Sequence, residues 1–148
     1  MRVLFVCLGN ICRSPAAEGL LRARCPDWII DSAGTSDWHL GAPPYAPMQA
    51  AARRRGLHLG DQRARQIVPD DFRRFDHVLA LDAAVLSDLR AMQGGALAKL
   101  FGTMAGLDGA DVPDPYYTRD FDGCLDMIAS GLPGLQAQLR SATSTKLR

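Results

Sequence analysis

The sequence predicts an α/β fold, an open four-stranded parallel sheet with helices on both faces. Short apolar runs rich in β-forming residues alternate with longer segments in which apolar residues recur at helical spacing, as in successive βαβ units. The first run, Val3-Leu4-Phe5-Val6, is apolar throughout, which is typical of a strand buried on both faces of a parallel sheet. The 148 residues, 47% of them hydrophobic, suit a single domain spanning 1–148.

Four strands and four main helices are expected along the chain. The strands are expected at about 3–6, 28–30, 76–81 and 97–101. The helices are expected from Ser14-Pro15 to about Cys25, and at about 45–55, 83–92 and 120–140. In the first of them, Ser14 is the N-cap candidate and Pro15 the first helical residue. A turn is expected at 31–36, a long loop at 102–118 and a frayed end from Ser141 to Arg148.

Charge and cysteine content exclude several classes of protein. The 17 Lys and Arg against 16 Asp and Glu leave a net charge of +1, and both signs are scattered, so nucleic-acid or membrane-surface binding is not expected. No apolar run approaches the roughly 20 residues of a membrane span, and Val3–Val6 is too short for a signal peptide. We therefore expect a cytoplasmic protein. Four dispersed cysteines without metal-ligand spacing predict neither a disulfide framework nor a metal site, and no cofactor is expected.

The segment after the first strand has the features of a phosphate-binding loop. Cys7 is separated from Arg13 and Ser14, which lie at the start of the first predicted helix, by five loop residues: Leu8, Gly9, Asn10, Ile11 and Cys12. A short loop that returns to a helix start directs backbone N–H groups inward and adds the positive end of the helix dipole. Arg13 supplies a planar fork for two phosphate oxygens. The same field favours a thiolate at Cys7, and Ser14 could donate a hydrogen bond to it.

A thiolate that attacks a phosphate ester needs an acid to protonate the leaving group. Asp114 is the best candidate, because two prolines hold it rigid and two aromatic rings follow it. The alternative is a plain turn aspartate. His39, His58 and His77 are poorer candidates, since a lone histidine in a loop, turn or strand start is usually structural or exposed.

Trp38, Tyr116 and Tyr117 are the candidate walls of a crevice. Their rings could line a slot deep enough for the flat aromatic group of a phosphotyrosine. Packing at the rim of the site is an equally good interpretation of the same residues.

Together these motifs resemble the low-molecular-weight protein tyrosine phosphatases along nearly the whole chain. Three segments carry the resemblance: Cys7 to Pro15, Asp31-Ser32-Ala33-Gly34-Thr35 with Trp38, and Asp114-Pro115-Tyr116-Tyr117. The resemblance implies that Cys7 forms a phosphocysteine, that Arg13 binds the phosphoryl oxygens, and that Asp114 protonates the leaving tyrosine and then activates water. It also implies that Asn10 holds the loop in a positive-φ conformation, supported by Ser14 and Ser32.

The resemblance also covers regulation and the supporting residues. Cys12 matches a second loop cysteine that in some members forms a reversible disulfide with the nucleophile, which makes it the expected redox partner of Cys7. Gln62 stands where members often have a histidine that helps to hold the loop asparagine, and Val85 stands where an asparagine is frequent. Both departures affect expectations about loop rigidity and rate rather than about the type of reaction.

The expected partner is a tyrosine-phosphorylated protein, with a bacterial tyrosine kinase as one candidate. A thioredoxin-coupled arsenate reductase would share the loop, but it needs further cysteines near the middle of the chain, and none occurs in 26–123. A phosphate-binding module without turnover would not need Cys7, Arg13 and Asp114 together. A nucleotide-binding P-loop is excluded, because no Gly-Lys-Ser/Thr follows the first strand.

Overall fold

The computed structural model of the chain describes the backbone of residues 1–147 and the side chains of residues 1–142. Its centre is one parallel sheet in the strand order β2-β1-β3-β4. The strands are β1 (Arg2–Cys7), β2 (Ile29–Gly34), β3 (His77–Ala80) and β4 (Lys99–Leu100). β1 pairs with β2 over its whole length and with β3 from Val3 to Val6, so both of its edges are covered by neighbouring strands. The predicted four-stranded parallel sheet is confirmed.

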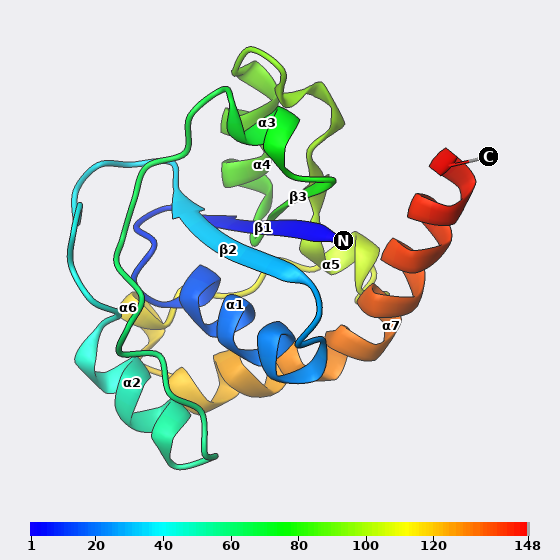
Figure 1. Cartoon of the computed structure of the whole chain (residues 1–148). Coiled ribbons are helices and arrows are strands. Elements are labelled where there is room, and N and C mark those ends of the chain that lie inside the picture. The colour runs from blue at the N-terminus through cyan, green and yellow to red at the C-terminus, as the bar shows by residue number, and fades with distance from the viewer. Residues whose placement is uncertain (148) are drawn as a thin grey trace.

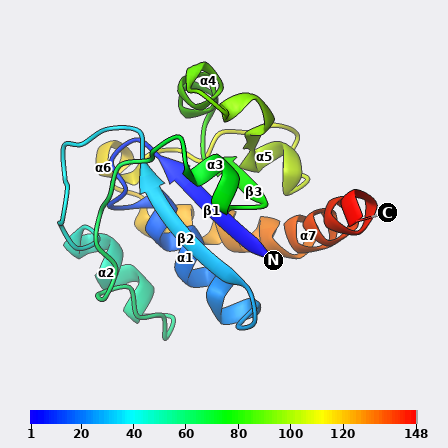
Figure 2. The same ribbon diagram turned by 45° about the horizontal axis from the view of Figure 1, so that its top comes forward.

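Helices cover both faces of this sheet, as predicted (Figure 1). On one face, Val3 and Phe5 pack against α1 (Arg13–Arg24), α5 (Phe101–Met104) and α7 (Phe121–Leu147), with α2 (Ala46–Arg53) beside them. On the other face, Leu4 and Val6 pack against α4 (Ala83–Ala91), with α3 (Asp71–Arg74) beside it. The turned view separates the two layers of helices (Figure 2). The alternation of side chains along β1 therefore divides the core in two.

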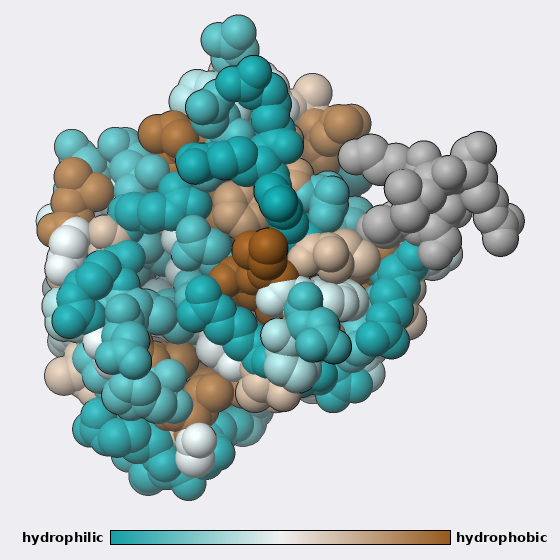
Figure 3. Space-filling view, in the orientation of Figure 1, coloured by the Kyte–Doolittle hydropathy of each residue, from teal (hydrophilic) through white to brown (hydrophobic). Residues whose placement is uncertain are grey.

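Two short elements complete the chain, η1 (Gly95–Leu97) and α6 (Pro115–Thr118). Neither was predicted, and nor was α3. In the orientation of Figure 3 the surface is mostly hydrophilic, with small separate apolar patches. No helix in the described part of the chain has both the length and the apolar character needed to cross a membrane.

Several predicted boundaries were wrong for physical reasons. β2 continues through the expected turn to Gly34, because six consecutive residues pair with β1, while Trp28 lies before the strand. β4 stops at Leu100, and Phe101 begins α5 instead of ending the strand. The expected loop 102–118 contains most of α5 and all of α6.

The start of α1 and the end of α7 also differ from the prediction. α1 begins at Arg13 with Cys12 in the N-cap position and no side-chain cap, so Ser14 is not the cap. Its hydroxyl is instead directed into the loop. At the C-terminus α7 continues to Leu147, where a frayed end was expected from Ser141, and residue 148 lies outside the described residues. Before this last part, Leu135 and Leu139 are buried in the core.

Candidate active site

The candidate site lies at the carboxyl end of the sheet, where β1 meets the start of α1. Cys7 is the last residue of β1 and is almost completely buried. Its Sγ accepts a hydrogen bond from the Asn10 backbone N–H at 3.3 Å and lies 3.0 Å from the Ser14 Oγ. Both groups can stabilise negative charge on the sulfur. The loop between β1 and α1 thus encloses the sulfur as the sequence predicts.

Asn10 holds this loop from behind. Its φ of 55° places it in the left-handed region, which costs energy for a residue with a side chain. Its Nδ2 donates to the Ser14 Oγ at 2.8 Å and to the Ser32 Oγ at 3.0 Å, and its Oδ1 accepts from the backbone N–H of Arg65 at 3.0 Å. The three bonds fix the conformation that the loop requires.

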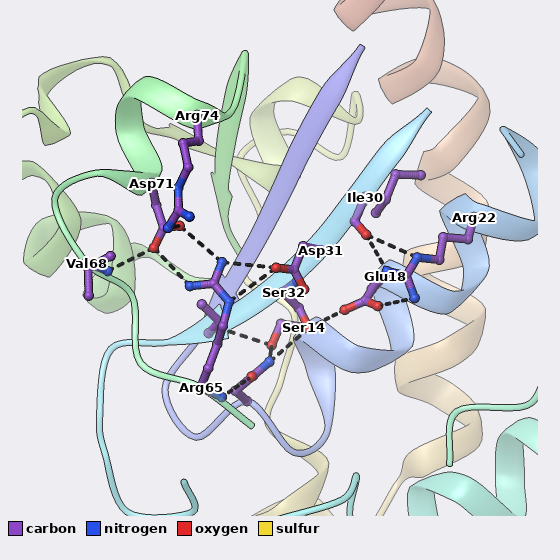
Figure 4. A network of polar contacts seen from close by, with 12 residues as sticks. Ser14, Glu18, Arg22, Ile30, Asp31, Ser32, Arg65, Val68, Asp71 and Arg74 are labelled. Atoms are coloured by element: carbon purple, nitrogen blue, oxygen red, sulfur yellow. Dashed lines mark hydrogen bonds and ion pairs between the residues drawn. The ribbon is translucent and has the colours of Figure 1, made fainter. Parts of the chain in front are cut away.

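From Ser32 and Arg65, the two partners of Asn10 outside the loop, the polar network continues in two directions (Figure 4). On one side, Ser32 donates to the buried carboxylate of Glu18 at 2.6 Å, and Glu18 pairs with Arg22. On the other side, the Arg65 guanidinium lies between Asp31 and the fully buried Asp71. The loop is therefore connected by hydrogen bonds and ion pairs to β2, α1 and α3.

Arg13 projects into the site from the first turn of α1 and is held by oxygen atoms from distant segments. Its Nη1 donates to Asp82 Oδ2 at 2.6 Å and to the Val112 carbonyl at 3.0 Å, and its Nη2 lies 3.5 Å from Asp114 Oδ2. Burial alone would lower the pKa of this guanidinium, but negative charge at Cys7, Asp82 and Asp114 raises it above its ordinary value. Arg13 therefore stays a cation although it is almost completely buried.

Asp114 is the N-cap of α6, with Pro115 at the first helical position. Its Oδ1 accepts from the Tyr116 backbone N–H at 3.0 Å, which leaves Oδ2 directed toward Arg13. The cap explains why a proline-flanked aspartate is held in one orientation within an otherwise open segment.

The three predicted catalytic residues line one pocket of about 260 Å³. All three predicted crevice residues, Trp38, Tyr116 and Tyr117, line it together with Cys7, Arg13 and Asp114. The side chains of Trp38 (67% exposed) and Tyr117 (72% exposed) stand open to solvent at the mouth, while the cysteine lies at the bottom. The pocket is thus a slot with a thiol at its base and aromatic rings at its rim.

Sequence reasoning missed two residues of the site. Asp82 follows β3 and forms the shortest contact of Arg13. Its position at the carboxyl end of a central strand, where ligands of such sheets bind, could have indicated its place in the site. His39 lines the pocket against Gly9, whose missing side chain makes room for it. His39 had been set aside as a lone loop histidine.

The two departures noted in the sequence have different outcomes. Gln62 does not hold Asn10, because its Nε2 donates to the Pro15 carbonyl at 3.0 Å, and the backbone of Arg65 supplies the donor to Asn10. Val85 lies in the first turn of α4 with its side chain in the core, and its backbone N–H donates to Asp82 Oδ1, the N-cap of that helix, at 2.7 Å. Gln62 thus contacts the first turn of α1, and Val85 contacts the carboxylate that pairs with Arg13.

All four cysteines are free and buried. Cys12 lies beside the pocket, and burial together with negative charge at Cys7 and Asp114 raises the pKa of its thiol well above the ordinary value. It is therefore a neutral thiol at physiological pH.

Comparison with known proteins agrees with this geometry. Residues 2–145 match the family model described as low molecular weight phosphotyrosine protein phosphatase. The chain belongs to this family. It is 39% identical to the low-molecular-weight protein-tyrosine-phosphatase YfkJ of Bacillus subtilis, over 93% of this chain and 95% of the relative.

Solved structures of two such phosphatases have the same fold. The YfkJ crystal structure superposes with a TM-score of 0.87, covering 95% of this chain and 94% of its own. A protein tyrosine phosphatase from Entamoeba histolytica, crystallised with Hepes in its active site, is 31% identical with a TM-score of 0.86, covering 97% of this chain and 99% of its own. The predicted family and fold are confirmed.

Proposed function

We propose that this low-molecular-weight protein tyrosine phosphatase works as a single domain that hydrolyses phosphotyrosine through a phosphocysteine on Cys7. The observation that carries the proposal is the single pocket that Cys7, Arg13 and Asp114 line together, with Arg13 Nη2 lying 3.5 Å from Asp114 Oδ2. The aromatic rings at the mouth suit a phosphate carried on an aryl group.

In the first step, the loop N–H groups and Arg13 bind the phosphoryl oxygens, and the Cys7 thiolate attacks phosphorus. The bond from phosphorus to the tyrosyl oxygen breaks, and Asp114 gives its proton to that oxygen. The Asn10 N–H and the Ser14 hydroxyl hold the sulfur in place for the attack.

In the second step, the Asp114 carboxylate accepts a proton from water, whose oxygen attacks phosphorus and releases inorganic phosphate. Cys7 leaves as a thiolate, stabilised again by Ser14 and Asn10. Both steps use these side chains and water alone, so we propose that neither a metal nor a cofactor takes part.

We assign the substrate to the tyrosine-phosphorylated proteins and propose a bacterial tyrosine kinase as one member of that class. We also propose that the enzyme works in the cytoplasm. A reducing compartment keeps Cys7 as the free thiol that catalysis requires, and all four cysteines are free.

We further propose reversible redox control by Cys12. Hydrogen peroxide would oxidise the Cys7 thiolate to a sulfenic acid, and the Cys12 thiol would attack that sulfur, releasing water and forming a disulfide. Peroxide-treated wild type should regain activity with thiol, whereas Cys12→Ser should recover far less. Equal recovery of the two proteins would contradict the proposal.

The main test is hydrolysis of p-nitrophenyl phosphate between pH 4 and 8, with thiol and EDTA present. Cys7→Ser should be inactive, and Asp114→Asn should be slowed and lose the alkaline fall of the wild-type profile. If the wild type binds vanadate without turnover, the chain is a phosphate-binding module and the proposal fails.

A further inference from the structure

An aromatic cluster beside the pocket connects the phosphate-binding loop to the segment that carries Asp114. It consists of three aromatic residues, Tyr45, Tyr116 and Phe121, together with Arg119. We call this cluster the aromatic brace. Tyr45 precedes α2, Tyr116 and Arg119 belong to α6 and its end, and Phe121 begins α7. Tyr45 is far from the other three residues in the sequence, but the start of α2 packs near α6 and α7 (Figure 1).

Arg119 joins the members of the brace. Its φ of 65° ends α6 in a left-handed conformation and turns the side chain back over the rings. The guanidinium carbon lies 5.4 Å from the ring centroid of Tyr45 and 5.1 Å from that of Phe121. Its Nη1 also donates to the Tyr45 hydroxyl at 3.1 Å and to the Tyr116 carbonyl at 3.4 Å. Arg119 thus contacts Tyr45, which precedes α2, as well as Tyr116 of α6 and Phe121 of α7.

Tyr45 contacts both parts of the active site. Its backbone N–H donates to the Ile11 carbonyl in the phosphate-binding loop at 2.8 Å. Its ring packs on Tyr116, with the centroids 5.2 Å apart. One residue therefore touches the loop that holds the nucleophile and the helix that holds the acid.

Tyr116 completes the connection to the acid, because its backbone N–H is the donor that orients Asp114 Oδ1. We propose that Tyr45 and Arg119 are positioning residues, which hold the Asp114 carboxyl at its working distance from the phosphate-binding loop. The inference rests on the proposed role of Asp114. Proton donation depends steeply on placement, so a small displacement of α6 should slow it.

The test compares two substrates that differ in their need for an acid. Phenolate is a poor leaving group and needs the Asp114 proton, whereas p-nitrophenolate is a better leaving group and depends on that proton much less. Arg119→Ala should lower kcat/KM for phenyl phosphate about 5- to 10-fold, and that for p-nitrophenyl phosphate less than about 2-fold. Tyr45→Phe, which keeps the ring and removes only the hydroxyl, should change kcat/KM in the same direction by a smaller factor.

A double-mutant cycle identifies the route of the effect. In an Asp114→Asn background, Arg119→Ala should change kcat/KM for phenyl phosphate less than about 2-fold, because the acid it positions is gone. Arg73→Ala removes an exposed arginine far from the pocket and serves as the matched control. Unchanged thermal midpoints of the variants would exclude general unfolding.

Two results would overturn the inference. One is an equal loss with both substrates, which indicates a binding or structural effect; the other is no loss with either. If Asp114→Asn itself leaves phenyl phosphate hydrolysis unchanged, the proposed function of Asp114 fails instead. The two failures are therefore distinguishable.

Discussion

At the scale of single residues, the chemistry of the site depends on what surrounds one sulfur atom. The Ser14 hydroxyl lies 3.0 Å from Cys7 Sγ and also accepts from Asn10 Nδ2. Because Asn10 donates to the serine oxygen, Ser14 uses its own hydrogen as a donor, and its contact with the sulfur at 3.0 Å is shorter than the one with the Ala33 carbonyl at 3.5 Å. Ser14 therefore couples the conformation of the loop to the charge on the nucleophile.

Replacement of this serine tests that coupling. A hydrogen bond to a charged group contributes about 1.5–3 kcal/mol, so Ser14→Ala should lower kcat for p-nitrophenyl phosphate roughly 10- to 100-fold. Release of the Cys7 thiolate from the phosphocysteine is the step expected to slow. Ser130→Ala, which removes a hydroxyl that donates to the Met127 carbonyl in its own helix, is the control. A kcat within about 2-fold of wild type would contradict the assigned contact.

At the scale of elements, α1 is joined to β2 by a carboxylate inside the protein. Glu18 is buried in α1, accepts from Ser32 of β2 and pairs with Arg22 one turn later. Burial raises the pKa of this carboxyl, although the Ser32 hydrogen bond and the Arg22 charge act in the opposite direction. The helix therefore contains a group whose protonation is linked to folding.

The sign of the linkage follows from the raised pKa. The folded protein holds the Glu18 proton more tightly than the unfolded chain, whose carboxyl titrates near about 4.3. The contribution of the Glu18 proton to the free energy of unfolding is full below that pH, and it is lost as pH rises through the folded-state pKa of Glu18. Glu18→Gln cannot titrate, so the free energy of unfolding of wild type minus that of the variant should fall from pH 4 to pH 7. Urea unfolding of both proteins measures it, and a difference that is constant or rises with pH would refute the linkage.

At the scale of the whole molecule, the core on the α1 side of the sheet holds the site together. α7 places Ile128 and Leu125 in that core without exposure. Its N-terminal end also carries Phe121 of the aromatic brace, so the packing of one helix supports both stability and the crevice.

A cavity in this core should reduce stability more than activity. Ile128→Ala should lower the free energy of unfolding by about 2–5 kcal/mol, with Tm falling roughly 2–4 °C for each kcal/mol. The variant should remain active below its transition, because Ile128 does not line the pocket. Thermal unfolding followed by circular dichroism measures the loss. Leu97→Ala, whose side chain is 81% exposed in wild type, should change Tm little, and a similar loss in both variants would count against the assigned core.

The fold class and most of the candidate site could be predicted from the residues alone. A continuous apolar strand followed by Cys7, a turn-rich loop and Arg13 has few structural solutions, because the spacing and the helix start specify the loop locally. The rigidity of Asp114 was likewise encoded by its neighbouring prolines. The length of β2 was not predictable locally, since its polar residues become strand only through pairing with β1.

Only the tertiary structure decided which distant groups complete the site. Asp82 and the Val112 carbonyl reach Arg13 because the carboxyl ends of the strands meet at one edge. The backbone of Arg65, rather than Gln62, holds Asn10 because the 65–67 segment runs beside the end of β2. Such contacts depend on how elements pack across long stretches of chain, and local sequence patterns carry no record of that packing.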